Sequence, residues 1–146
     1  MLVSGFTLLF SVLIASLLLA IGIAIFNITL KELLLSSSAR ESQFAIYAAD
    51  TGIECALYWD LVGAAFGTST SARTINCNAQ TLEYTTGASY PATTTFTIQF
   101  SPEPYCAVVA VGKHTNPART IVTSRGYNTC ETENSRRVER ILQATY

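Results

Sequence analysis

The stretch Phe6-Thr-Leu-Leu-Phe-Ser-Val-Leu-Ile-Ala-Ser-Leu-Leu-Leu-Ala-Ile-Gly-Ile-Ala-Ile-Phe26 decides how this chain is organised. Its character is almost continuously apolar, and the first charged side chain of the whole sequence is Lys31. At a rise of 1.5 Å per residue the stretch makes about 31 Å of helix, which matches the hydrocarbon thickness of a bilayer. The sequence therefore predicts a single membrane span over residues 6–29.

The alternative for this stretch is a cleaved secretory signal. The apolar run is longer than the core of an ordinary signal peptide, and no basic residues precede it, so we favour the span. The polar members Thr7, Ser11 and Ser16 are compatible with lipid because their hydroxyls can bond back to helix carbonyls.

Helical periodicity continues beyond the span. Apolar and small residues recur in steps of three and four, at Leu30, Leu33, Leu34, Phe44, Ala45, Ala48, Gly52, Cys55, Ala56 and Trp59. No proline occurs before Pro91, and Ser36–Ser38 is the weakest point for a helix. We expect one helix from about Phe6 to about Asp60, whose amphipathic half, residues 30–60, packs against the rest of the chain.

The remainder, residues 61–146, reads as strands and turns. Phe96, Ile98 and Phe100 alternate with polar residues, which is typical of a half-buried strand. Before this strand we expect a loop over Gly63–Ser71. After it we expect a buried strand over Cys106–Lys113, a turn over His114–Ala118 and a return strand over Arg119–Arg125. A last strand is expected over about Arg136–Tyr146. The predicted fold is α+β, a long helix packed on a small antiparallel sheet of three to four strands.

Composition supports one small folded domain and argues against several functions. The chain has 146 residues, 49% of them hydrophobic and only 13% charged, with a formal net charge of −1. Nine Lys and Arg against ten Asp and Glu give no electrostatic footprint for nucleic acid. The single histidine, His114, excludes mechanisms that need two or three imidazoles.

Four cysteines, Cys55, Cys77, Cys106 and Cys130, indicate an oxidising compartment. None stands in a C-x-x-C pair, so the spacing does not favour zinc, and we expect no metal and no cofactor. Of the three possible disulfide pairings we prefer Cys55–Cys77 and Cys106–Cys130. The first would hold the loop after the helix against the helix end, and the second would close the mouth of the predicted hairpin. Buried free thiols are the alternative.

The N-terminus Gly5-Phe6-Thr7-Leu8-Leu9, followed by a long apolar helix, resembles the class III signal of type IV pilins and type II secretion pseudopilins. The segment Ala48-Ala-Asp-Thr-Gly-Ile-Glu-Cys-Ala56 is similar to the helix of PilX-type minor pilins. The resemblance implies that residues 1–5 are a leader, that a prepilin peptidase cuts between Gly5 and Phe6, and that Phe6 becomes N-methylated.

Two positions depart from the family pattern. Most pilins carry Glu at the fifth mature position, where it pairs with a neighbour's N-terminal amine, but here that position is Phe10. Members that lack this Glu, such as GspK-type pseudopilins, are minor subunits at the filament tip, so the resemblance implies a minor or tip role. The leader Met1–Ser4 also lacks the usual basic residue.

The expected function is assembly, with no enzymatic activity. Within a filament the apolar helix would pack on sister helices of other pilin subunits, helped by the small residues Ala15, Ser16, Ala20, Gly22 and Ala24. We expect a single-pass protein of the cytoplasmic membrane with its head outside, and then a cell-surface filament. DNA or a surface ligand stays open as a target of the head. The alternatives are an anchored binding or adhesin domain outside any filament, and a secreted disulfide-rich domain.

Three groups of polar residues are candidates for chemistry. Asp50 and Glu54 lie four residues apart on the helix, where a solvated face is the favoured interpretation. His114 is expected in an exposed turn. Arg136, Arg137 and Arg140 form a small basic cluster on the last strand, either a solvated strand edge or a contact for an acidic surface or DNA.

Overall fold

A computed structural model describes the backbone of residues 3–67, 73–86 and 91–146. One helix, α1 (Val3–Leu61), precedes six strands, β1 (Arg73–Cys77), β2 (Gln80–Tyr84), β3 (Ala92–Gln99), β4 (Cys106–Thr115), β5 (Ala118–Tyr127) and β6 (Glu139–Thr145). The chain divides into two compact units, residues 1–39 and residues 40–146. We call the second unit the head. The α+β composition predicted from the sequence is confirmed.

Helix α1 is continuous across the serine-rich point. Ser37 Oγ donates to the carbonyl of Leu34 at 2.9 Å, so this hydroxyl is satisfied within the helix and does not interrupt it. The helix ends at Leu61, and Ala64 then adopts a left-handed φ of 44°, which turns the chain so that the Ala65 N–H bonds the Trp59 carbonyl at 3.0 Å.

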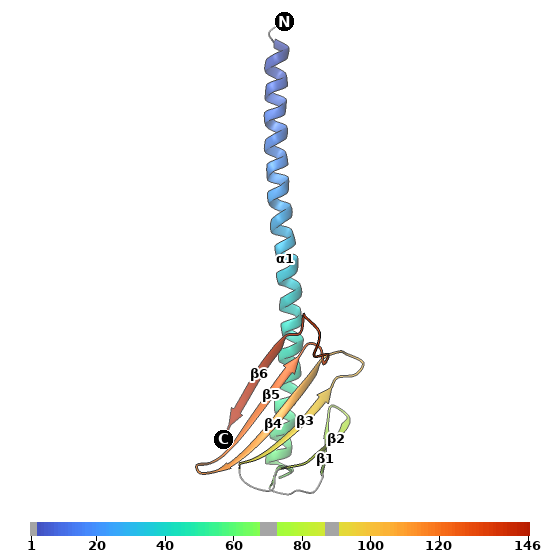
Figure 1. The fold of residues 1–146 in the computed structure, drawn as a ribbon, viewed down its shortest axis with the longest axis vertical. Coiled ribbons are helices and arrows are strands. Elements are labelled where there is room, and N and C mark those ends of the chain that lie inside the picture. Colours follow the sequence, from blue (N-terminus) through green and yellow to red (C-terminus); the bar gives the residue numbers. More distant parts are fainter. Residues whose placement is uncertain (1–2, 68–72, 87–90) are drawn as a thin grey trace. The chain divides into compact units, whose positions relative to one another are not determined.

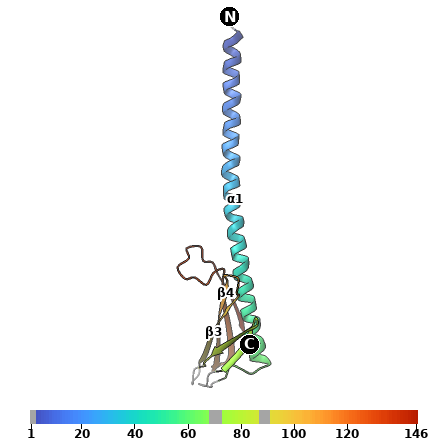
Figure 2. The same ribbon diagram turned by 90° about the vertical axis from the view of Figure 1, so that its right-hand side faces the viewer.

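The main sheet of the head is antiparallel, in the order β3-β4-β5-β6 (Figure 1). Burial alternates strictly along β3, because every second residue faces the helix side and the others face solvent. Within the head, the C-terminal part of α1 lies along one face of this sheet (Figure 2). The core between them is built from Ala48, Ile53, Ala56, Phe96, Ile98, Ala107, Val109, Val111 and Val122.

A second, two-stranded sheet pairs β1 with β2 and was not expected from the sequence. Asn78 and Ala79 connect the strands, and both have positive φ, 51° and 58°. Such a two-residue turn normally carries Asn-Gly or Asp-Gly, so the Asn-Ala pair hid the hairpin. The main sheet has four strands, as predicted, and the β1–β2 hairpin adds a second sheet that the prediction lacked.

Several predicted boundaries are also wrong. His114 belongs to β4 and pairs with Arg119 across β5, because the β4–β5 hairpin turns only at residues 116–117. The last strand begins at Glu139, so Arg136 and Arg137 precede it, and Phe100 lies just after β3. Of the expected loop over residues 63–71, residues 68–71 lie outside the described part of the chain.

Candidate functional site

The predicted processing position lies in the first turns of α1. Phe6 is 71% exposed, and its ring stacks on that of Phe10 with centroids 6.4 Å apart. A Cβ added to Gly5 would meet nothing within 4 Å. The described structure of this region therefore leaves Gly5 and Phe6 open to a second protein.

From Phe6 to Leu30 α1 is a segment without charge and without a covering layer. Its large apolar side chains are all exposed, and so are the small residues Ala15, Ser16, Ala20, Gly22 and Ala24. Ser11 and Ser16 each donate to the carbonyl three residues earlier, at 2.8 Å. Polar hydrogens of these hydroxyls are thus satisfied inside the helix, as a bilayer requires.

By length and composition, one stretch of α1 is long and apolar enough to cross a membrane, among the residues that the structure describes. The predicted stripe needs correction at Leu30, Leu33 and Leu34, because all three side chains are exposed. Burial of the helix by the sheet begins only within the head, where Ala45 is the first fully buried side chain.

The head buries a face of α1 that is made of very small residues. Ala45, Ala48, Ala49 and Ala56 are each 0% exposed. A Cβ added to Gly126 of β5 would lie 2.0 Å from the Ala45 carbonyl oxygen and 2.4 Å from the Ala49 nitrogen. The backbones of helix and strand therefore approach closely at this point, and only glycine on β5 permits the approach.

A second close approach lies two turns further along the helix. A Cβ on Gly52 would come within 2.4 Å of Ser124 Oγ and 2.9 Å of Val109. Ser124 Oγ is buried and has no hydrogen-bond partner in the described residues. At this point the helix and the sheet are thus held together by shape and small side chains, because Ser124 Oγ makes no bond.

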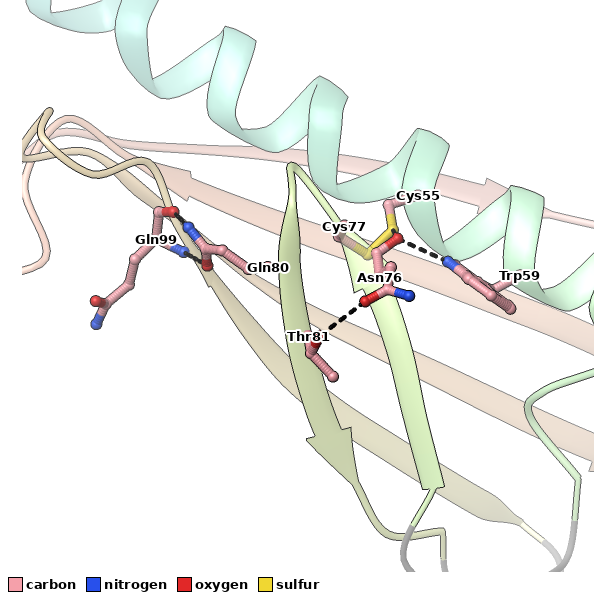
Figure 3. The surroundings of a disulfide bond; sticks show 7 residues. All are labelled: Cys55, Trp59, Asn76, Cys77, Gln80, Thr81 and Gln99. Carbon is pink, nitrogen blue, oxygen red and sulfur yellow. Dashed lines mark hydrogen bonds between the residues drawn. A yellow bond between two sulfur atoms is a disulfide. The ribbon is translucent and has the colours of Figure 1, made fainter.

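Disulfide Cys55–Cys77 joins α1 to β1, with Cα atoms 5.9 Å apart (Figure 3). Beside it, Trp59 Nε1 donates to the Asn76 carbonyl at 3.0 Å, and Thr81 Oγ1 donates to Asn76 Oδ1 at 2.9 Å. The β1–β2 hairpin is therefore attached to the helix end by one covalent bond and one hydrogen bond from the only tryptophan.

Disulfide Cys106–Cys130 joins the start of β4 to the segment after β5, with Cα atoms 5.6 Å apart. Both pairs are those preferred from chain order. The connection from β5 to β6 is held by Asn128. Its Nδ2 donates to Glu41 Oε2 at 2.9 Å, and its Oδ1 accepts from the Val138 N–H at 2.6 Å. Glu41 belongs to α1, so this asparagine fixes the β5–β6 connection to the helix.

A polar cluster closes the opposite end of the helix–sheet contact. The carboxylate of Asp60, whose side chain is 3% exposed, accepts from Lys113 Nζ at 2.6 Å and from the Tyr146 hydroxyl at 2.5 Å. Lys113 Nζ also donates to Thr120 Oγ1 at 3.0 Å. Burial, and secondly the bond to Asp60, raise the pKa of Tyr146 well above its ordinary value.

Among the described residues, the three groups of polar candidates for chemistry lie apart from one another. Asp50 and Glu54 are exposed on α1. In the described part of the chain no three His, Cys, Asp or Glu side chains lie together as metal ligands. His114 is half-buried in β4, where an exposed turn had been expected.

The three arginines predicted as one basic cluster are separated by their contacts. Arg137 lies over the Tyr127 ring, 3.7 Å from its centroid, and Arg140 Nε donates to Ser42 Oγ of α1 at 2.9 Å. Arg136 is exposed before β6. The prediction of a shared patch on the last strand was wrong, because two of the three side chains brace the head.

Sequence reasoning missed the roles of Asp60, Lys113 and Asn128. Asp60 carried one usable signal, since it is a lone acidic residue on the apolar stripe at the helix end, where burial demands a cationic partner. No signal in the sequence marks Asn128, because its partners Glu41 and Val138 are far away in the chain.

Comparison with protein-family models finds no match, and comparisons with curated proteins and with solved structures find none.

Proposed function

We propose that this chain is a structural subunit, minor or tip-located, of a filament of the type IV pilus or type II secretion pseudopilus kind. The observation that carries the proposal is the division of one helix. Its residues 6–30 are apolar, uncharged and exposed, while its residues 45–60 are the buried partner of an antiparallel sheet. A helix with one half unpaired by its own chain calls for lipid or other helices around that half.

The proposed mechanism is an exchange of contacts. Before assembly the uncharged segment lies in the cytoplasmic membrane, with the disulfide-bonded head on the oxidising side. In the filament the same surface packs on helices of neighbouring pilin subunits. Lipid tails are as apolar as leucine side chains, so the exchange has a small net free energy, and the small residues Ala15, Ala20 and Gly22 permit close packing.

Phe10 supports a minor position. A phenylalanine there is 55% exposed and apolar, so it offers no carboxylate to a neighbour's N-terminal ammonium. An unpaired ammonium inside an apolar helix bundle is costly, which disfavours a filament built mainly from this chain. A few copies, or a position at the end, avoid that cost.

The test uses the protein made in its natural host with a functional prepilin peptidase. Filaments are sheared from the cells, and intact-mass spectrometry is performed on the chain in the sheared and membrane fractions. We expect a mature chain that begins at N-methylated Phe6 and is present in the sheared fraction at low copy number. A chain that keeps Met1 and stays in the membrane would instead favour an anchored binding domain, and loss of the whole apolar segment would favour a secreted domain.

A further inference from the structure

The side of α1 that faces away from the sheet carries most of the exposed apolar surface of the head. Among the described residues of the head, seven large hydrophobic side chains are exposed, and five of them lie on α1 or directly after it, at Ile46, Tyr47, Tyr58, Leu61 and Val62. Tyr47 is 63% exposed and Tyr58 is 58% exposed. Such a concentration on one side of a small domain is typical of a protein–protein contact.

Acidic residues share this side of the helix, and basic residues do not. Tyr47, Asp50, Glu54, Tyr58 and Leu61 follow each other in steps of three and four and form what we call the acidic strip. No Lys or Arg occurs in the sequence between Arg40 and Arg73. Neither Asp50 nor Glu54 makes an ion pair with any described residue. The strip therefore offers two uncompensated carboxylates between two tyrosines.

The outer face of the main sheet carries two exposed arginines, Arg119 and Arg125, and one carboxylate, that of Glu139. Cross-strand pairing places Arg125 beside Val108 on one side and Ile141 on the other, and Ala110 beside Thr123. We call these five residues, with Ile121, the outward sheet face. The side chain of Arg125 is 54% exposed, and among the described residues it has one ion pair, a long one of 3.7 Å to Glu139. Ile141 is 52% exposed.

The acidic strip and the outward row of β5 also match in length. From Tyr47 to Leu61 the acidic strip is about 21 Å long at the rise of an α-helix. The outward-facing row of β5, from Arg119 to Arg125, is about 20 Å long at the rise of a strand. This sheet already packs one helix on its inner face, and its outer face is covered by no helix of the described chain. A second helix there would complete a three-layer arrangement.

We propose that the acidic strip of one copy of this chain docks on the outward sheet face of a second copy, with Asp50 and Glu54 facing Arg125. The two surfaces differ, so the contact is heterologous and leaves a free strip at one end and a free sheet face at the other. Copies can therefore follow one another. This inference rests on the proposed filament, which holds subunits side by side, and it means that a minor subunit enters as a short run of copies.

The experiment uses the full chain in its host, with a photoreactive benzoylphenylalanine in place of Tyr58. Covalent dimers are isolated by their doubled mass, which distinguishes links between copies from links within one. After irradiation of cells, we expect covalent dimers whose linked tryptic peptide is Thr120–Arg125 or Ile141–Tyr146. A probe at Thr81, exposed on β2, is the control and should give no such dimer.

Charge reversal provides the second arm. Glu54→Arg and Arg125→Glu should each lower the dimer yield by about fivefold, and the double variant should restore most of it, since one exposed ion pair contributes about that factor. Glu103→Lys and Arg73→Glu are charge-matched controls at exposed positions elsewhere and should leave the yield unchanged. Formation of both disulfides, checked by mass, shows that each variant has folded.

The results that would overturn the docking of two copies differ from the result that would overturn the filament proposal. Links from Tyr58 to another protein, links to the second copy's helix, no dimer, or no rescue by the double variant would each overturn the docking. A chain absent from the sheared fraction overturns the filament alone, because the link can still be measured in the membrane fraction. Covalent dimers through the expected peptides, found only in membranes, would support the docking and reject the filament.

Discussion

Two regions of helix α1, residues 6–30 and residues 45–60, differ in the size and the burial of their apolar side chains. The first carries large side chains such as Leu8, Leu9 and Phe26, all exposed. The second buries alanine and glycine against a sheet. Large side chains suit a surface whose surroundings are fluid lipid or exchangeable helices, whereas small ones let two backbones approach closely and fix one geometry. The size of the helix residues, as much as their hydrophobicity, therefore indicates which part of α1 is buried by the chain's own sheet.

The largest expected effect comes from adding a side chain where helix α1 and strand β5 lie closest together. Gly126→Ala places a Cβ 2.0 Å from the Ala45 carbonyl oxygen, which the backbone can relieve only by moving apart. We expect a loss of about 4 kcal/mol in the free energy of unfolding of the head. Denaturant titration of the full chain in detergent, followed by Trp59 fluorescence, measures it.

Gly22→Ala is the matched control for that change. A Cβ at this position meets nothing within 4 Å, so the unfolding curve reported by Trp59 should not move. A loss of less than about 1 kcal/mol for Gly126→Ala would show that the close approach is not required, and the contrast between the two halves of α1 would then lose its basis.

The next effect concerns the half of the helix that the chain leaves uncovered. Ile14→Arg adds a charge at the middle of the predicted span, and we expect insertion into membranes to become less favourable by about 3 kcal/mol. Membrane fractionation of cells measures this change. Tyr47→Arg, in the head part of α1, is the control that should leave insertion unchanged. Equal insertion of both variants would contradict a membrane role for residues 6–29.

A smaller effect comes from Tyr146, which bonds to the one carboxylate buried at the end of the helix–sheet contact. Its pKa is raised in the folded head, first by burial and then by Asp60, and burial also raises the pKa of Tyr84. Below about pH 9 both tyrosines are protonated in the folded and unfolded states, so they add no pH dependence. Above pH 10 the unfolded state ionises first, and stability falls as the pH rises.

Tyr146→Phe tests this assignment. Loss of the bond to Asp60 should cost about 1 kcal/mol at pH 8, and the fall in stability between pH 10 and 11.5 should become shallower than in the unmodified chain. Free energies of unfolding measured at several pH values give both quantities. An unchanged slope would mean that the phenol of Tyr146 ionises equally easily in both states, against the hydrogen bond to the buried carboxylate.

Patterns of nearby residues were sufficient to predict the long helix, the β4–β5 hairpin and the preferred cysteine pairs. Each depends on periodicity or on chain order. No comparable pattern indicates where burial of α1 begins, because Leu33 and Ala48 fit the same apolar stripe and only packing on the sheet distinguishes them. Sequence reasoning also missed Asp60 with Lys113, and Asn128 with Glu41, since these pairs are brought together by tertiary structure across 53 and 87 residues.

The smallest expected effect concerns the hairpin that the sequence concealed. Ala79 has a φ of 58°, where a Cβ is unfavourable, whereas Asn78 at 51° is a residue type that tolerates this region. Ala79→Gly should therefore stabilise the head by about 0.5–1 kcal/mol, with Asn78→Gly near zero as its control. Trp59 fluorescence is a suitable measurement because its indole bonds the Asn76 carbonyl in β1 of the same hairpin. If Ala79→Gly destabilised the head, the two-residue turn would be wrong, and with it the β1–β2 register that places Cys77 beside the helix.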